Sequence, residues 1–141
     1  MRSRAVSVED NKAVVRRFID EAFVNGDPAS VELVSESFVP HTWPSVQPGR
    51  ESLKQTVVRM AGGLSDVAFE VEDVIAEGDR VAVRLTARAT HKGDFMGMPA
   101  AGKSHEIAEI HIFRLEDGLI VEHWHVADML EMMKQIGAMP G

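Results

Sequence analysis

The feature that most constrains the fold is the segment 105–126, in which apolar and polar residues alternate around a single Asp117-Gly118 pair. Alternation of this kind predicts β-strands, and Asp-Gly is typical of a hairpin turn because glycine accepts the positive φ that such turns require. We expect a three-residue loop, Glu116–Gly118, closed by a glycine bulge. Leu115 then lies opposite Leu119, and the segment forms two antiparallel strands.

Helical patterns occur mainly before this hairpin. Ser7 and Asp10 form a variant of the capping box that opens helices, and apolar residues then recur at helical spacing. Helices are expected over about 7–25, 27–37, 50–63 and 129–136, and strands over about 69–77, 80–89, 106–115 and 119–126. The proline-rich segment 38–49 is expected to be irregular or an edge strand, and 92–103 a loop. Helices followed by antiparallel strands predict an α+β fold, and 141 residues suit one domain, 1–141.

The expected register brings titratable residues of the hairpin to one face of the sheet. It places His111 opposite His123 and Glu109 opposite His125, and residues paired across strands share a face. Phe113 and its expected partner Val121 belong to the same face, whereas the opposite face is expected to carry Ala108, Ile110, Ile112, Ile120 and Trp124. Since helices must cover one face, we interpret the first as the polar floor of an apolar cavity. A slip of one residue would divide the four polar residues between the two faces.

Several kinds of chemistry fit such a cluster. Histidine suits general acid–base catalysis because its ordinary pKa, about 6.5, lies near working pH. A wet surface face is the simplest alternative. A metal site is another, since His123-x-His125 and Glu109-x-His111 can each present two ligands that suit zinc or non-haem iron. We favour acid–base chemistry with no metal and no cofactor.

Further candidates lie outside the hairpin, and each has a structural alternative. Candidates for a cavity mouth or lid are His41, Trp43, Phe95, Met96 and Met98. The first two can equally pack an edge strand, and the other three can be core or subunit contacts. Asp128 most simply caps the last helix, although it could replace a catalytic carboxylate if it turned inward. His91 and His105 flank the 92–103 loop and are expected to face solvent.

Composition excludes several classes of function. The net charge is −7, which disfavours nucleic acid and anionic membranes as partners. There are no cysteines, so disulfides, thiolate metal sites and cysteine nucleophiles are absent. No apolar stretch follows the charged start, and no run approaches the roughly 20 apolar residues of a membrane helix. We expect a cytoplasmic protein that acts on, or binds, a small molecule.

One family shares these patterns. The segments Val81–Thr90, Gly93–Pro99, Gly102-Lys103 and Ile120–Trp124, in this order of elements, resemble the SnoaL-like polyketide cyclases of the nuclear transport factor 2-like superfamily. The likeness covers nearly the whole chain. It implies a cone-shaped α+β barrel, in which a strongly curved antiparallel sheet packs on three to four helices around a hydrophobic cavity. It also implies a homo-oligomer, a dimer or tetramer joined through the sheets.

The resemblance also implies an activity. Characterised cyclases close a ring of a polyketide by intramolecular aldol condensation without a cofactor. The family's histidine corresponds to His111, whereas its catalytic aspartate corresponds to position 125, which is histidine here. We expect His125 to act as the base, His111 to donate to the enolate oxygen, and Glu109 and His123 to support them. The alternatives are a binding protein that uses the same cavity, a related hydroxylase, hydrolase or isomerase, and a scaffold dimer with a vestigial cavity.

Overall fold

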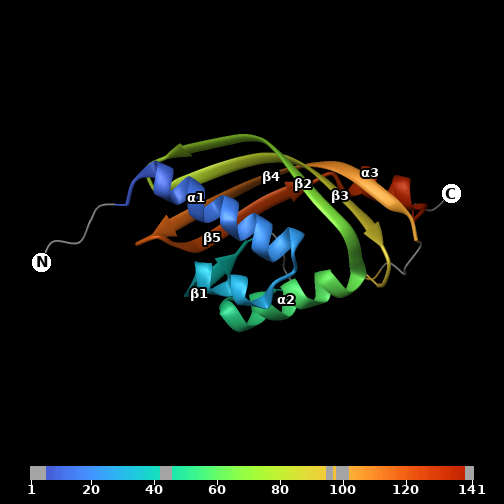
Figure 1. Cartoon of the computed structure of the whole chain (residues 1–141), viewed down its shortest axis with the longest axis horizontal. Coiled ribbons are helices and arrows are strands. Elements are labelled where there is room, and N and C mark those ends of the chain that lie inside the picture. The colour runs from blue at the N-terminus through green and yellow to red at the C-terminus, as the bar shows by residue number, and fades with distance from the viewer. Residues whose placement is uncertain (1–5, 42–45, 95–96, 98–101, 139–141) are drawn as a thin grey trace, which may run out of the picture.

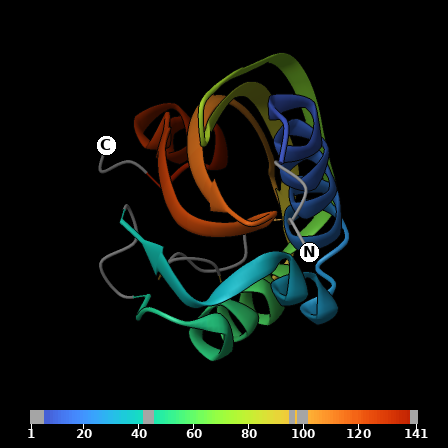
Figure 2. The ribbon, with the colours of Figure 1, turned by 90° about the vertical axis from the view of Figure 1, so that its left-hand side faces the viewer.

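One curved sheet of five strands, open at its two edges, forms the centre of the protein (Figures 1 and 2). The computed structural model describes residues 6–41, 46–94, 97 and 102–138. The strand order is β1-β5-β4-β3-β2, antiparallel except for the parallel pair of β1 and β5. The elements are α1 (Val8–Phe18), a π-helical turn (Ile19–Val24), a 3₁₀ helix (Pro28–Leu33), β1 (Val34–Pro40), α2 (Arg50–Gly63), β2 (Leu64–Glu77), β3 (Arg80–His91), β4 (Ser104–Glu116), β5 (Leu119–Ala127) and α3 (Met129–Ile136). The predicted α+β class is confirmed.

The first helix begins where the sequence predicts. The Ser7 hydroxyl accepts a hydrogen bond from the Asp10 amide, and the Asp10 carboxylate accepts one from the Ser7 amide. After Phe18 the helix widens into the π-helical turn, in which the Asn25 amide donates to the carbonyl of Asp20. A π turn rotates the residues that follow it relative to a regular helix, and it sets the direction of Phe23.

The second predicted helix is shorter than expected. Asp27 caps it as predicted, but it is a 3₁₀ helix that ends at Leu33. The chain continues at once as β1, where Val34 and Phe38 are completely buried. The expected helical stretch up to residue 37 was therefore wrong, because two apolar residues four apart fit one face of a helix as well as one face of a strand.

The sheet curves because β2 does not pair evenly with β3. Register shifts occur between Ser65 and Ala68 and again between Val71 and Asp73. Asp66 lies in the first shift with a φ of 53°. Bulges of this kind bend a strand and increase its twist. The bent sheet forms an arch, and its concave side faces α1 (Figure 2).

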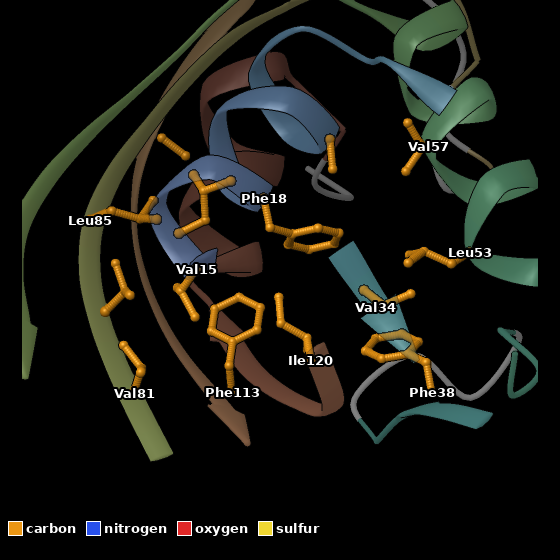
Figure 3. Close-up of a cluster of buried hydrophobic side chains, with 14 of the residues drawn as sticks. Val15, Phe18, Val34, Phe38, Leu53, Val57, Val81, Leu85, Phe113 and Ile120 are labelled. Carbon is orange, nitrogen blue, oxygen red and sulfur yellow. The ribbon is translucent and has the colours of Figure 1, made fainter. Parts of the chain in front are cut away.

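The hydrophobic core fills the concave side of the arch. Val15 and Phe18 of α1 meet Val81, Leu85 and Phe113 of the sheet, and all five side chains are at most 1% exposed. Residues of α2 and β1 close the core from the other side (Figure 3). No helix among the described residues is both long enough and apolar enough to span a membrane.

The hairpin between β4 and β5 differs from the prediction in two places. Its loop has two residues, Asp117 and Gly118, both with positive φ, and Leu115 pairs with Ile120 rather than Leu119. A bulge follows, because Arg114 pairs with Glu122 and leaves Val121 as an extra residue on β5.

Each difference moves the register by one residue, so together they restore the predicted faces beyond the bulge. His111 therefore pairs with His125 instead of His123, and Phe113 pairs with His123. Only the residues before the bulge change sides. Ile120, predicted for the outer face, is completely buried in the core.

Candidate functional site

The histidine cluster lies on the concave face of the sheet, on β4 and β5. His111 and His123 are buried, His125 is partly exposed, and Glu109 has a side chain that is only 13% exposed. The ring centroids of the three histidines are 5.0 to 5.2 Å apart. The structure therefore brings together the four residues that the hairpin pattern placed on one face.

A directed chain of hydrogen bonds runs through the cluster. The Nε2–H of His111 donates to Oε1 of Glu109 at 2.8 Å, since a carboxylate oxygen accepts. The other nitrogen of His111, Nδ1, lies 2.8 Å from Nε2 of His123, and in the tautomer of His111 with its single proton on Nε2 it accepts from Nε2–H of His123. Both nitrogens of His111 are thus used inside the cluster. In the structure described, these nitrogens contact Glu109 and His123, and the expected donation of His111 to a substrate oxygen stays a prediction.

Aromatic rings enclose the buried part of the cluster. Phe113 stacks on His123, with ring centroids 4.4 Å apart and planes 4° from parallel. The ring centroid of Phe23, a residue of the π-helical turn, lies 5.9 Å from that of His111 and 6.2 Å from that of His123. The sequence placed Phe23 on the apolar face of the first helix but gave no signal that it covers the histidines, since that depends on the π turn.

This apolar enclosure makes two of the histidines, His123 and His125, weak bases. Burial, together with the neighbouring His111, lowers the pKa of His125 to about 4, although Glu109 acts in the opposite direction. Burial likewise holds the pKa of His123 well below its ordinary value. Both rings are therefore neutral at pH 7 and can accept a proton.

The cluster also has the dimensions of a metal site. One nitrogen from each of His111, His123 and His125 can be chosen so that all three lie within 4.8 Å of one another. Three imidazoles suit zinc, copper, nickel or iron. In the structure described, however, His111 and His123 are joined by a hydrogen bond.

His41 does not belong to this site. Its ring stacks on that of Trp124, with the ring centroids 4.7 Å apart. Its Nε2 lies 2.6 Å from a carboxylate oxygen of Glu122. Trp124 pairs with Ile112 on the convex face, opposite the cluster. The expectation that His41 lines the cavity is corrected; the alternative of packing at the edge strand describes its position.

The other cavity candidates have different outcomes. Asp128 caps α3, where its carboxylate accepts from the amide of Glu131, so it is not turned toward the histidines as a substitute base. Val121 is buried at the bulge of β5. Four candidates lie outside the described residues, namely Trp43, Phe95, Met96 and Met98.

A second histidine pair occupies the same concave face. His91 and His105 are 0% and 5% exposed, and Nε2 of His91 lies 2.8 Å from Nδ1 of His105. The expectation that both face solvent was wrong. His91 ends β3 in phase with the buried residues of that strand, and His105 is in phase with Ile107 and Glu109. Alternation counted through the strand ends would have revealed this.

The fold and the site together define a small α+β protein with a curved sheet over helices and a histidine–glutamate cluster on its concave face. The sequence model of the SnoaL-like polyketide cyclases matches residues 13–136. The chain belongs to the SnoaL-like polyketide cyclase family, and its fold is that of the nuclear transport factor 2-like superfamily, as the resemblance implied.

Individual relatives agree with this membership. The chain is 31% identical over 90 residues to aklanonic acid methyl ester cyclase DnrD of Streptomyces peucetius, a match that covers 63% of this chain and 62% of DnrD. It is 35% identical over 74 residues to aklanonic acid methyl ester cyclase DauD of Streptomyces sp. strain C5, which covers 52% of this chain and 43% of DauD. Both matches therefore span less than two thirds of the relative.

Similarity to solved structures extends over almost the whole chain. The structure of TsrD from Streptomyces laurentii superimposes with a TM-score of 0.87 at 27% identity, and the match covers 96% of this chain and all of TsrD.

Proposed function

We propose that the protein is a cyclase-type enzyme that closes a ring of a polyketide-like carbonyl compound by intramolecular aldol condensation, with His125 as the base. The observation that carries this proposal is the position of His125. Among the three histidines of the cluster it is the partly exposed one, beside the buried His111 and His123. The family resemblance places the catalytic aspartate of the cyclases at this position.

The replacement of aspartate by histidine is compatible with the chemistry. An ordinary aspartate has a pKa of about 3.9, and burial lowers the pKa of His125 to about 4. A neutral His125 is therefore about as basic as an ordinary aspartate carboxylate. Glu109, whose charge favours the protonated ring, supports the imidazolium that forms.

The proposed reaction needs no external reagent. His125 removes a proton from a carbon next to a carbonyl, and the resulting enolate attacks a second carbonyl of the same molecule. A carbon–carbon bond forms, and the attacked oxygen becomes an alkoxide. Protonated His125 returns the proton to this oxygen, which leaves an alcohol and regenerates the neutral base. His111 holds Glu109 and His123 in place and acts as a positioning residue.

Substitution at position 125 tests the assignment. With aklanonic acid methyl ester, the compound in the names of DnrD and DauD, as first probe, we expect His125→Ala to lower kcat about 10²–10⁴-fold, the range for a lost general base. His125→Asp, which restores the family residue, should keep turnover within about tenfold of the wild type. His41→Ala, on the convex face, is the matched control and should leave turnover unchanged, with circular dichroism confirming the fold of each variant.

The same experiment separates catalysis from binding. The loss of the family aspartate also favours a protein that binds a carbonyl compound without converting it. Saturable binding by calorimetry without product would support that alternative. Full turnover by the His125→Ala variant would refute the role of His125 as base.

A further inference from the structure

The three clustered imidazoles are arranged on the sheet in a way that can surround a single atom. His111 and His125 are directly paired across β4 and β5, and His123 lies two residues before His125 on the same face. A tetrahedral zinc ion has nitrogen ligands at about 2.0–2.1 Å, so its nitrogens lie roughly 3.3 Å apart. The observed His111–His123 nitrogen distance is 2.8 Å, and all three nitrogens fit within 4.8 Å. The spacing of the three rings is therefore close to that of three nitrogen ligands around one ion.

Glu109 fixes the tautomer that such a site needs. Because Nε2–H of His111 donates to Glu109, the lone pair of His111 is on Nδ1, which points at His123. A carboxylate that orients a ligating histidine through its second nitrogen is a common feature of zinc sites. Glu109 is itself largely buried, so the contact is shielded from water.

A shift of one proton frees the nitrogen of His123 that faces His111. In the hydrogen-bonded chain Nε2 of His123 carries its proton toward His111. If that proton transfers to Nδ1 of the same ring, Nε2 becomes a lone pair, and the ring stays neutral. The hydrogen bond between the two rings is then replaced by two nitrogen–metal bonds, with no change in total charge on the protein.

We propose that His111, His123 and His125 bind one divalent transition-metal ion of the zinc type, with Glu109 orienting His111. Three protein ligands leave a fourth position for water or another small ligand. Occupation uses the lone pair of His125, so the ion excludes the acid–base role of this residue. The metal-binding proposal stands on the geometry of the cluster and does not depend on the activity proposed above.

Metal titration of the purified, chelator-treated protein tests the proposal. We expect zinc to bind at one equivalent per chain by calorimetry, and cobalt to give the visible absorption of a tetrahedral site. Glu109→Gln should weaken zinc binding about 10–100-fold, the effect of losing the partner of a ligand. His125→Ala should weaken it by more than that, and since His125 is partly exposed this variant is expected to fold.

The second histidine pair provides a matched control. His91 and His105 are buried and share a 2.8 Å contact, but the pair offers two imidazoles instead of three. His105→Asn should therefore leave zinc binding unchanged. Absence of stoichiometric binding, or binding that survives His125→Ala, would overturn the proposal, as would an equal loss in His105→Asn. Neither result bears on turnover, which is measured separately in the absence of metal.

Discussion

At the scale of single residues, the buried pair His91 and His105 makes the stability of the folded protein depend on pH. Both rings are shielded from water, and this burial lowers the pKa of each below the ordinary histidine value, further for His105 because His91 is close. The negative charge of Glu109 raises the pKa of His105 and so opposes part of this effect. The folded state thus holds both rings neutral, whereas the unfolded chain titrates them near pH 6.5.

The sign of the effect follows from proton binding. Below about pH 6.5 the unfolded chain binds more protons than the folded protein, so acid favours unfolding. We expect the free energy of unfolding, measured in urea, to be greatest above pH 6.5 and to fall as the pH decreases to 5.

Variants can assign part of this loss to the pair. A His91→Gln/His105→Gln variant should lose less stability between pH 7 and pH 5 than the wild type, because neither replacement titrates. Identical slopes in the variant and the wild type would show that the pair does not contribute.

At the scale of elements, a side chain of α3 satisfies the backbone of β4 where β5 no longer pairs with it. β5 ends where Ala127 pairs with Glu109, so β4 extends past it. The side-chain amide of Gln135 accepts from the backbone amide of Glu106 at 2.7 Å and donates to the carbonyl of the same residue at 2.9 Å. One side chain thereby makes both hydrogen bonds that a residue of a neighbouring strand would make.

Removal of this contact should loosen the end of β4. We expect Gln135→Ala to lower the free energy of unfolding by about 1–2 kcal/mol, because two backbone groups lose their partner. Exchange of the Glu106 amide hydrogen, followed by NMR, should accelerate. Lys134→Ala, at the exposed neighbouring position of α3, should change stability by less than about 0.5 kcal/mol. Unchanged exchange at Glu106 would contradict the contact.

At the scale of the whole molecule, the convex face of the sheet exposes several large apolar side chains. Large apolar side chains are exposed across β2, β4 and β5, namely Ile75, Ile110, Ile112 and Val126. Charged residues lie among them in pairs, such as Arg84 with Asp73 at 2.7 Å. Exposed apolar patches of this kind often mark interfaces, and a patch with its own balanced charges is suited to a second copy of itself.

The convex face is therefore where we expect the homo-oligomer that family resemblance implies. Val126→Glu should shift the protein to monomer in light scattering, because a two-fold interface would bring two buried charges together. Val58→Glu is the matched control, since Val58 is also exposed, at 52% against 67% for Val126, but lies on α2. A wild type that stays monomeric at high concentration would refute self-association through this face.

The local elements of the fold were predictable because their signals are short-range. Ser7 and Asp10 define the start of α1 by reciprocal hydrogen bonds three residues apart, and Asp117-Gly118 defines the turn of the hairpin. Alternation identified β3, β4, β5 and the greater part of β2, since side chains of a strand point to opposite faces in turn. These features depend on neighbours in the chain, which the sequence displays directly.

The candidate site was predictable only in part. The shared face of Glu109 and the three histidines was correctly placed, because the two register shifts of one residue add up to two and so leave each side chain on its predicted face. The sequence contains no signal for the bulge at Val121, because whether a residue is paired or extra depends on the packing of both strands on the core. The inward direction of Ile120 depends on the same bulge, so the sequence contains no signal for it either.

The sequence by itself thus determined the order of the elements, the α+β class and the set of polar residues on one face. Only the tertiary structure decided that both nitrogens of His111 are used, that Phe23 covers the cluster, that His91 and His105 are buried and that His41 lies on the convex face. The reason is physical: these properties arise from contacts between segments far apart in the chain, and curvature and bulges, rather than local periodicity, determine which segments meet.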